Sequence, residues 1–453
     1  MKSVILAASL ALVLPFGSKA SELRLIALDP AHSHAAQVFV TMLPGFSPEV
    51  HVYAPLGPGL TSYLNSVARF NERKTNPTEW SFDVYAGADY LKRMLREPPG
   101  NVVVMSGRNQ RKIDDILACI RAGQNVLADK PWIIDSRDLP KLETALNLAD
   151  SKGLAAYDCM TQRFDVAYQI QRALVNDREV FGDAAPGTAA DPAVRLENLH
   201  ALLKFNGAVP SHRPAWYFDI RQQGEGMADV GTHLVDLVFW TLFADQAIDY
   251  RRDLQVLKAT RTPLVLTREQ FERVTGEKAW PDFVRNAVKD DQLEYYTNNT
   301  ALFTVRGVHV FLRVQWQYEA PSGVKDSYLA SFRGTRATVR LREGKAENFI
   351  PEVDVIPNSA GERAGVLTAL RNRFQALNPR YPGLSLQETG TTIRIVIPTA
   401  DRTPDANYFA LLVDRFLGYV HNPKTLPPWE KANMMAKYYI TTTTVDVARG
   451  AQP

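Results

Sequence analysis

The chain contains very little cysteine. Only Cys119 and Cys159 occur among its 453 residues, and each lies in an apolar stretch. A disulfide-based scaffold is therefore excluded, and both thiols are expected to be buried as small hydrophobic groups. A charge excess of either sign is also lacking, because 52 Lys and Arg residues face 49 Asp and Glu residues, with no long basic run. This balance gives no basis for binding to nucleic acid or to an anionic membrane.

Long apolar runs are absent except at the N-terminus. Lys2 precedes an apolar run from Val4 to Phe16, and Ser18-Lys19-Ala20 has the small-x-small pattern of a cleavage site. This combination predicts a secretory signal peptide over residues 1–20, so the mature protein is expected to be periplasmic or secreted. The run is too short to span a bilayer, and no other stretch reaches the roughly 18 apolar residues of a membrane helix.

Residues 23–155 alternate between short apolar strands and helices. The strands are expected at Leu23–Leu28, Val50–Ala54, Asn101–Met105, Val126–Ala128 and Leu154–Tyr157. The intervening helices are expected at Ala35–Met42, Tyr90–Leu95, Ile113–Arg121 and Leu139–Ala149. Near-continuous apolar strands separated by helices indicate a doubly wound parallel sheet covered on both faces. Ligands bind such sheets at the carboxyl ends of the strands.

Residues 156–453 have a different texture, with longer alternating strands. These are expected at Val194–Leu199, Leu254–Ala259, Ala301–Val305, Val308–Tyr318, Tyr328–Phe332, Ala337–Leu341 and Thr391–Ile397. Helices are expected at Tyr168–Leu174, Thr267–Gly276, Gly361–Leu377 and Asn407–Val420. The pattern predicts a second, α+β domain with a large, mainly antiparallel open sheet. The fold class is therefore α/β, with domains at 23–155 and 156–453.

The segment Gly224–Asp236 combines a glycine-rich bend with Asp229 and His233, four residues apart. On a helix this spacing places both side chains on one face, with Cβ atoms roughly 5–6 Å apart. A carboxylate beside an imidazole is the arrangement that orients a general base. The alternative is a helix N-terminus in which Asp229 is a cap and His233 an ordinary polar residue.

Three segments together resemble a known family. Ala122–Pro131, which reads AGQNVLADKP, resembles a signature of the glucose–fructose oxidoreductase, inositol dehydrogenase and rhizopine-catabolism family (Gfo/Idh/MocA). Gly224–Asp236 resembles the same family's GGGxxxDxGxH segment, and Tyr157–Phe164 resembles its crossing into the second domain. The three occur in the family's order and at its spacings. The resemblance implies a Rossmann domain, an α/β domain whose open sheet often forms a dimer contact, and NAD(P)-dependent chemistry on sugars or polyols.

The resemblance also implies catalytic roles for Lys130, Asp229 and His233, as the family's lysine, carboxylate and proton-transferring histidine. These residue types suit the chemistry, because oxidation of a carbinol needs a base with a pKa near the working pH. A lysine at a strand end can donate a hydrogen bond to the developing alkoxide. The predicted activity is therefore NAD(P)-dependent oxidation of a sugar hydroxyl by an exported enzyme.

The glycine fingerprint expected after the first strand is missing. A G-x-G-x-x-G turn lets pyrophosphate approach a helix N-terminus, but the three glycine positions hold Asp29, Ala31 and His34. An aspartate about 4 Å from a phosphate costs about 4 kcal/mol at an effective dielectric of about 20. The acid that usually contacts the ribose is also absent, since the second strand ends in Tyr53-Ala54-Pro55-Leu56.

NAD or NADP is still the predicted cofactor, in a weaker or differently organised site. Its phosphates are expected at backbone N–H groups between Ala31 and Ala35, with Asp29 turned away. Asn109 matches the asparagine of the family's TPNxxH turn, whereas Lys112 replaces its histidine. The candidate cofactor-binding residues are Asp29, Ala31, His32, His34, Asn109, Asp129 and Lys130.

His32 and His34 follow Asp29, and two imidazoles with a carboxylate can bind a metal. The alternative is that both histidines are polar residues at a helix start in a remodelled cofactor loop. No third convergent cluster of His or Cys is evident in the sequence, so no metal ligand is assigned.

The predicted substrate is a carbohydrate. Arg213, Asp219 and three aromatic residues lie within the eleven residues before Gly224, and such groups suit sugar binding. The substrate-binding candidates are Arg163, His200, Arg213, Trp216 and Asp219. A homo-oligomer formed through the C-terminal sheet is the expected protein partner. Two alternatives stay open: glycoside cleavage or elimination through transient oxidation, and a carbohydrate-binding pseudoenzyme without a cofactor.

Overall fold

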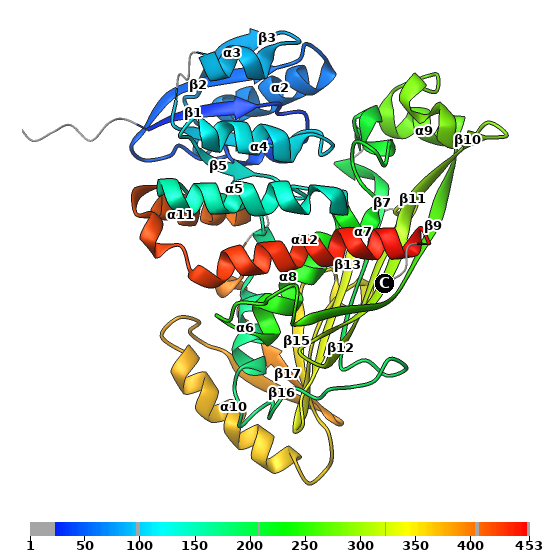
Figure 1. Ribbon diagram of the computed structural model, residues 1–453. Coiled ribbons are helices and arrows are strands. Elements are labelled where there is room, and N and C mark those ends of the chain that lie inside the picture. Colours follow the sequence, from blue (N-terminus) through cyan, green and yellow to red (C-terminus); the bar gives the residue numbers. More distant parts are fainter. Residues whose placement is uncertain (1–22, 97–99, 207–208, 322, 404–406, 451–453) are drawn as a thin grey trace, which may run out of the picture.

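The structure is a computed structural model that describes residues 23–96, 100–206, 209–321, 323–403 and 407–450. The predicted signal peptide lies outside these residues. Within them, no helix combines the length and the apolar character that a membrane crossing requires. Two separate sheets organise the molecule, with long helices between them (Figure 1).

The first sheet has six parallel strands in the order β3-β2-β1-β4-β5-β6. The strands are β1 (Leu23–Leu28), β2 (Phe46–Ala54), β3 (Ser81–Ala86), β4 (Val102–Met105), β5 (Asn125–Ala128) and β6 (Ala156–Asp158). The predicted doubly wound parallel sheet is confirmed. The strand order reverses between β1 and β4, so the loops after these two strands enclose the crevice where such sheets bind ligands.

Helices cover both faces of this sheet because alternate strand residues point to opposite sides. One face packs against α1 (His34–Gln37), α2 (Pro58–Glu72) and α11 (Tyr408–His421). The other face packs against α3 (Tyr90–Arg96), α4 (Lys112–Arg121), α5 (Leu139–Lys152) and α12 (Pro428–Ala448). Helices α11 and α12 come from the C-terminal end, so the last part of the chain returns to complete the first core.

The second sheet has eleven strands. Nine follow the order β10-β11-β12-β7-β13-β14-β15-β17-β16, while β8 pairs with β7 and β9 pairs with β11. The β7–β12 pair is parallel and the other neighbours are antiparallel, so the predicted mainly antiparallel sheet is confirmed. The strands are β7 (Val194–Asn206), β8 (Val209–Ser211), β9 (Leu254–Thr267), β10 (Val288–Lys289), β11 (Gln292–Val305), β12 (Val308–Glu319), β13 (Ser327–Arg333), β14 (Ala337–Glu343), β15 (Glu352–Pro357), β16 (Ser385–Thr389) and β17 (Thr392–Val396).

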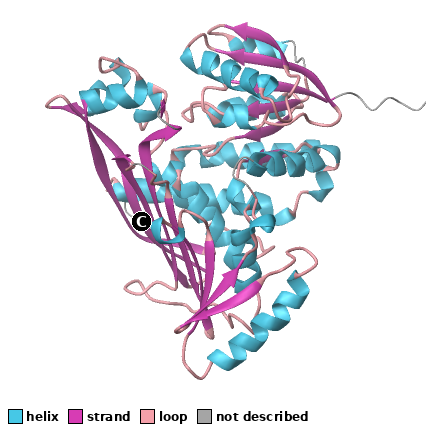
Figure 2. Cartoon of the chain, turned by 180° about the vertical axis from the view of Figure 1, so that it is seen from behind, coloured by secondary structure: helices cyan, strands magenta, loops and turns pink. Residues whose placement is uncertain are grey.

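One face of the large sheet is covered by helices, and Figure 2 shows its strands from behind. Residues along β11 and β12 alternate between buried and half-buried, as expected for a sheet with one packed face. The remaining helices are α6 (Val166–Val175), α7 (Gly226–Asp229), α8 (Gly231–Leu242), α9 (Arg268–Thr275) and α10 (Arg363–Leu377). Helix α12 contacts both α5 and α8, so it joins the two halves of the molecule.

Candidate active site

A cleft of about 1490 Å³ lies between the parallel sheet and the large sheet. The loop after β1, the end of β5 and the start of α2 form one wall, and β7, β12 and the α7–α8 segment contribute to the other. The predicted site residues along this cleft are Ala31, His32, His34, Lys130, His200, Arg213, Asp229 and His233. The structure thus brings the three predicted catalytic residues to one cleft.

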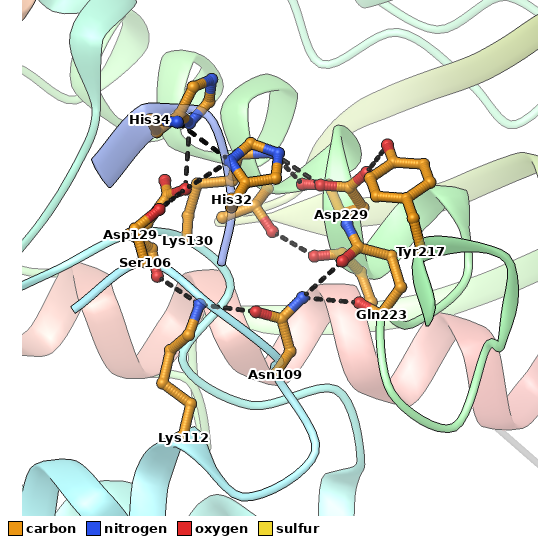
Figure 3. A network of polar contacts seen from close by, with 12 residues as sticks. His32, His34, Ser106, Asn109, Lys112, Asp129, Lys130, Tyr217, Gln223 and Asp229 are labelled. Carbon is orange, nitrogen blue, oxygen red and sulfur yellow. Dashed lines mark hydrogen bonds and ion pairs between the residues drawn. The ribbon is translucent and has the colours of Figure 1, made fainter. Parts of the chain in front are cut away.

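Lys130 and Asp229 form a buried ion pair at the cleft wall. Lys130 Nζ lies 2.6 Å from Asp229 Oδ1, and the Tyr217 hydroxyl donates to Asp229 Oδ2 at 2.7 Å. Burial alone would raise the pKa of Asp229, but the Lys130 charge and hydrogen bonds from Lys130 and Tyr217 hold that pKa well below its usual range. The lysine ammonium therefore has a fixed direction (Figure 3).

Two glycines explain how Asp229 reaches this position. Gly224 has a φ of +96°, in the left-handed region that favours glycine. A Cβ on Gly226 would lie 1.9 Å from the Thr297 carbonyl oxygen, so only glycine allows α7 to approach β11 so closely. The glycine-rich bend therefore positions the start of α7 against the large sheet, and Asp229 follows one helical turn later.

His233 lines the cleft but does not pair with Asp229. Both carboxylate oxygens of Asp229 bind Lys130 and Tyr217, so the expectation that Asp229 orients the imidazole is wrong. Loss of solvation and the nearby Lys130 charge lower the pKa of His233 to about 3. His233 was expected to be a base with a pKa near neutrality. In the structure its pKa is much lower, so its imidazole is neutral and lies close to the positive charge of Lys130.

The loop after β1 already uses most of the backbone donors that would hold a pyrophosphate. Four of the five N–H groups between residues 31 and 35 bond within the chain: Ala31 to Asp29 O, His32 to Ser106 O, His34 to His32 Nδ1 and Ala35 to His32 O. Helix α1 is also only four residues long, whereas Ala35–Met42 was expected. The residues therefore do not fit a pyrophosphate in the family's usual position, and the prediction of phosphate contacts at Ala31–Ala35 is not supported.

Asp29 turns away from the cleft. Its φ is +42°, so this first fingerprint position keeps the left-handed backbone that glycine usually provides. Its carboxylate lies against Gly107, where a Cβ would be 2.5 Å from Oδ2, and Arg108 is 3.7 Å from Oδ1. Burial raises the pKa of Asp29 although Arg108 opposes the shift. Asp29 is absent from the cleft wall. The prediction that it is a cofactor-binding residue is therefore corrected: its side chain packs within the loops instead.

Asn109 is also used within the protein. Its amide nitrogen donates to the Gln223 carbonyl at 2.8 Å, and its oxygen accepts from Lys112 Nζ at 2.5 Å. Lys112, which replaces the family's histidine, also donates to the Asp129 carbonyl at 2.9 Å, and burial lowers its pKa to about 8. The predicted role of Asn109 at a ribose is thus corrected: this buried amide links the two halves of the molecule.

His200 lies on the large-sheet side of the cleft. Its Nδ1 is 2.8 Å from Asp326 Oδ2, its ring stacks on Trp316, and its buried Nε2 has no hydrogen-bond partner among the described residues. Arg213 stacks over Trp316 and donates to the Leu202 carbonyl at 2.9 Å. These two candidates combine an aromatic platform with polar groups, which suits a carbohydrate.

The other three substrate candidates do not line the cleft. Arg163 is 5% exposed and binds Asp236 and Glu430 at the junction of the two halves. Trp216 is buried beneath Arg108, and Asp219 pairs with Arg221. A position in a segment that resembles the family and a local aromatic run predicted a substrate role for these three side chains, but the fold uses them for packing and internal ion pairs.

Sequence reasoning missed several residues of the site. Ser106 lies at the carboxyl end of β4, where the strand-end rule could have identified it. Tyr217 was visible as part of the aromatic run, but its bond to Asp229 depends on the approach of two distant segments. Trp316 lies on β12 of the large sheet and Asp326 lies in the loop before β13, and no local pattern marks them as partners of His200.

The comparisons with known proteins show that this chain is an oxidoreductase. The chain belongs to the Gfo/Idh/MocA type of oxidoreductase, and residues 170–449 match the family described as "Putative oxidoreductase C terminal domain". An oxidoreductase structure from Parabacteroides merdae is similar over 94% of this chain and 98% of that chain, with 38% identity and a TM-score of 0.92. No curated protein matches the chain.

More distant structures share the fold. KijD10, a 3-ketoreductase from Actinomadura kijaniata in complex with NADP and TDP-benzene, is 14% identical over 95% of this chain and 98% of that chain, with a TM-score of 0.56. GenD2 from gentamicin A biosynthesis, in complex with NAD, is 14% identical over 96% of this chain and 98% of that chain, with a TM-score of 0.55.

Proposed function

We propose that this protein is an exported NAD(P)-dependent oxidoreductase that oxidises a hydroxyl group of a carbohydrate or carbohydrate derivative, or reduces the corresponding ketone. The observation that carries the proposal is the Lys130 ammonium, fixed by Asp229 in an interdomain cleft beside a neutral His233. The ligands of KijD10 and GenD2 support NADP or NAD as the cofactor, because both proteins share this fold.

In this proposal, Lys130 and His233 act on the same substrate oxygen. The ammonium donates a hydrogen bond to the alkoxide that develops as the hydroxyl loses its proton, and His233 accepts that proton. The low pKa of His233 reflects lost solvation and the Lys130 charge. Negative charge on the substrate oxygen offsets the field of Lys130, so the imidazole becomes a better base as the reaction proceeds.

NAD(P) supplies the hydride acceptor or donor when it is bound. The loop after β1 does not fit its pyrophosphate in the usual way, because the backbone donors are already used. The cleft continues over Gly59, Ser62 and Ser66 at the start of α2, which leaves space for a nucleotide on that side. A displaced and weaker nucleotide site is therefore part of the proposal.

The substrate is assigned to the large-sheet side of the cleft. Trp316 offers an aromatic face, and His200 lines the same cleft with a buried Nε2 that has no hydrogen-bond partner among the described residues. Asp326 holds the other ring nitrogen and so fixes the direction of Nε2. Arg213 adds a cation next to the same aromatic ring.

The deciding experiment uses the mature full-length protein. Calorimetric titration with NAD and NADP is followed by incubation with a panel of sugars and glycosides, with detection of reduced nicotinamide and of ketone products. Nucleotide binding with ketone formation supports the proposal, and His233→Ala should abolish turnover without abolishing nucleotide binding. Release of an aglycone without net nucleotide reduction would instead indicate cleavage through transient oxidation.

A second candidate function is a carbohydrate-binding protein without a cofactor. The closed loop after β1 is the specific observation in its favour. Sugar binding without any detectable nucleotide binding would select this candidate and reject the oxidoreductase.

Export and self-association complete the proposal. N-terminal sequencing of the protein from its native host should find Ser21 as the first residue if residues 1–20 are removed. Light scattering should find a homo-oligomer if the half-buried face of the large sheet forms a contact between copies.

A further inference from the structure

Two histidines and one aspartate converge at the loops after β1 and β5. His34 Nδ1 lies 2.9 Å from Asp129 Oδ2, and His32 Nδ1 lies 3.4 Å from the same oxygen. The ligand atoms that these three residues offer all lie within 4.8 Å of one another. Asp129 therefore takes the position that the sequence pattern assigned to Asp29, which points away.

Two of the three spacings between the offered ligand atoms match the edges of a metal coordination polyhedron, and the third, between the two imidazoles, lies within 4.8 Å. Zinc binds imidazole nitrogen and carboxylate oxygen at about 2.0–2.2 Å. At bond lengths of about 2.05 Å, neighbouring ligand atoms lie about 2.9 Å apart in an octahedron and about 3.3 Å apart in a tetrahedron. The two nitrogen–oxygen distances, 2.9 Å and 3.4 Å, agree with these edges.

Hydrogen bonds alone leave this cluster incompletely satisfied. The His34 backbone N–H points to His32 Nδ1 at 3.3 Å, so that nitrogen presents a lone pair and has no proton to donate to Asp129. Asp129 is 4% exposed, and its Oδ1 has no hydrogen-bond partner among the described residues. The imidazole nitrogens face the other oxygen, Oδ2. A buried carboxylate oxygen without a partner is costly, and a cation bound by both oxygens of Asp129 would satisfy Oδ1 as well as the facing nitrogen lone pair.

We propose that His32 Nδ1, His34 Nδ1 and the carboxylate of Asp129 bind a divalent first-row transition-metal ion. Two imidazoles and one carboxylate favour Zn²⁺ or Fe²⁺ over Mg²⁺ and Ca²⁺, which prefer oxygen ligands. His32 and His34 line the cleft, so the remaining coordination positions face the substrate space. The metal would occupy the loop that holds pyrophosphate in relatives with a glycine fingerprint.

The surrounding groups are compatible with this ion. Lys130, a cation next to this cluster in sequence, is neutralised by Asp229 at 2.6 Å. Ser106 Oγ donates to Asp129 Oδ2 at 3.0 Å, and Lys112 holds the Asp129 carbonyl at 2.9 Å, so the carboxylate and its backbone are both fixed. Such outer contacts orient metal ligands and typically change affinity by about 10–100-fold. The proposal does not depend on the oxidoreductase activity, since it concerns binding alone.

The test uses the untagged mature protein, stripped with a chelator and titrated separately with Zn²⁺ and Co²⁺. Calorimetry should give one ion per chain, and bound Co²⁺ should show the visible absorption of a site with nitrogen ligands. The double variant His32→Ala/His34→Ala should bind at least about 100-fold more weakly, and Ser106→Ala about 10-fold more weakly. His51→Ala is the matched control, because His51 also contacts an aspartate, Asp83, at 3.1 Å.

Absence of stoichiometric binding in the wild-type protein would overturn the proposal, as would unchanged binding in the double variant. If the double variant does not fold, anomalous diffraction from a zinc-soaked wild-type crystal decides the question. A peak between His32, His34 and Asp129 supports the site, and a peak elsewhere or none rejects it.

Discussion

The loops that follow β1 and β5 meet at the cleft, where His34 binds Asp129, yet they relate to the family in opposite ways. The β5 loop keeps the Asp129-Lys130-Pro131 pattern, and its lysine lies in the cleft, paired with Asp229. The β1 loop has lost the glycine fingerprint and has filled the space with imidazoles and internal hydrogen bonds. The β5 side of the cleft keeps the residues of the family pattern, whereas the β1 side has different ones.

This difference shows that the fold does not depend on the sequence of the loop after β1. Strands β1 and β4 are held by apolar residues buried on both faces, and none of these contacts needs a glycine turn after β1. A resemblance that identifies the fold therefore carries less information about the nucleotide site than about the sheet. Each loop has to be judged by its own donors and acceptors.

The largest effect is expected at the retained loop. Lys130→Met removes the donor to the developing alkoxide, so kcat should fall by about 10³-fold, or about 4 kcal/mol. Initial rates with the identified substrate measure this loss. Lys141→Met, at a partly exposed lysine that binds Asp114, is the control and should leave the rate unchanged. Full activity of Lys130→Met would remove the catalytic assignment.

The next largest effect distinguishes an arginine that stabilises the fold, Arg163, from one that is proposed to contact the substrate, Arg213. Arg163→Leu leaves Asp236 and Glu430 buried without their shared partner, so the free energy of unfolding should fall by about 3–5 kcal/mol. Denaturant unfolding measures this change, with the exposed Arg285→Leu as control. In the fraction that stays folded, KM should be unchanged, whereas Arg213→Leu should raise KM. A raised KM in Arg163→Leu with normal stability would restore the substrate role.

The same junction predicts a pH effect. Burial opposes ionisation of Asp236, but Arg163 and Lys437 lower its pKa to about 2. The folded pKa is below the unfolded value of about 3.9, so this stabilisation is complete above about pH 4 and is lost as the pH falls towards 2. About 2 kcal/mol of the free energy of unfolding should disappear over this range.

Unfolding of the wild type and of Asp236→Asn across the acid range checks this prediction. The variant should lack that part of the acid-induced loss, while Asp282→Asn, at an exposed carboxylate, should behave like the wild type. If Asp236→Asn does not fold, Lys437→Met should shrink the loss by removing one of the two cations. An identical pH profile in Lys437→Met would contradict the linkage.

The sequence predicted the two sheets because hydrophobic periodicity reports burial directly. Apolar runs such as Val102–Met105 are buried on both faces, and the long alternating strands have one packed face. Helix α12 was not predicted. It lies between both halves of the molecule and is buried on most sides, so its sequence lacks the apolar stripe of a surface helix. Strand β3, at the edge of its sheet, is mostly exposed and has little apolar signal.

Sequence analysis identified those site residues that lie within a single local motif. Lys130 and Asp229 were identified separately, and the cleft joins them. The partners of Asp229 were not predictable, because the choice between His233 and Lys130 depends on side-chain directions set by distant segments. The same holds for His32 and His34, whose carboxylate partner is Asp129, about a hundred residues away, and not the nearby Asp29.

The smallest effect is expected from restoring a single glycine in the rebuilt loop. Asp29→Gly should change the affinity for NAD or NADP by less than about 3-fold, because the carboxylate already faces Gly107 and Arg108. The backbone donors of residues 31–35 would remain bonded within the chain, and the φ of +42° suits glycine. If Asp29 did face a phosphate, removing a repulsion of about 4 kcal/mol would tighten binding by nearly 10³-fold. Calorimetric titration distinguishes the two outcomes, since a gain of that size would show that the loop opens when the nucleotide binds and that charge alone limits its affinity.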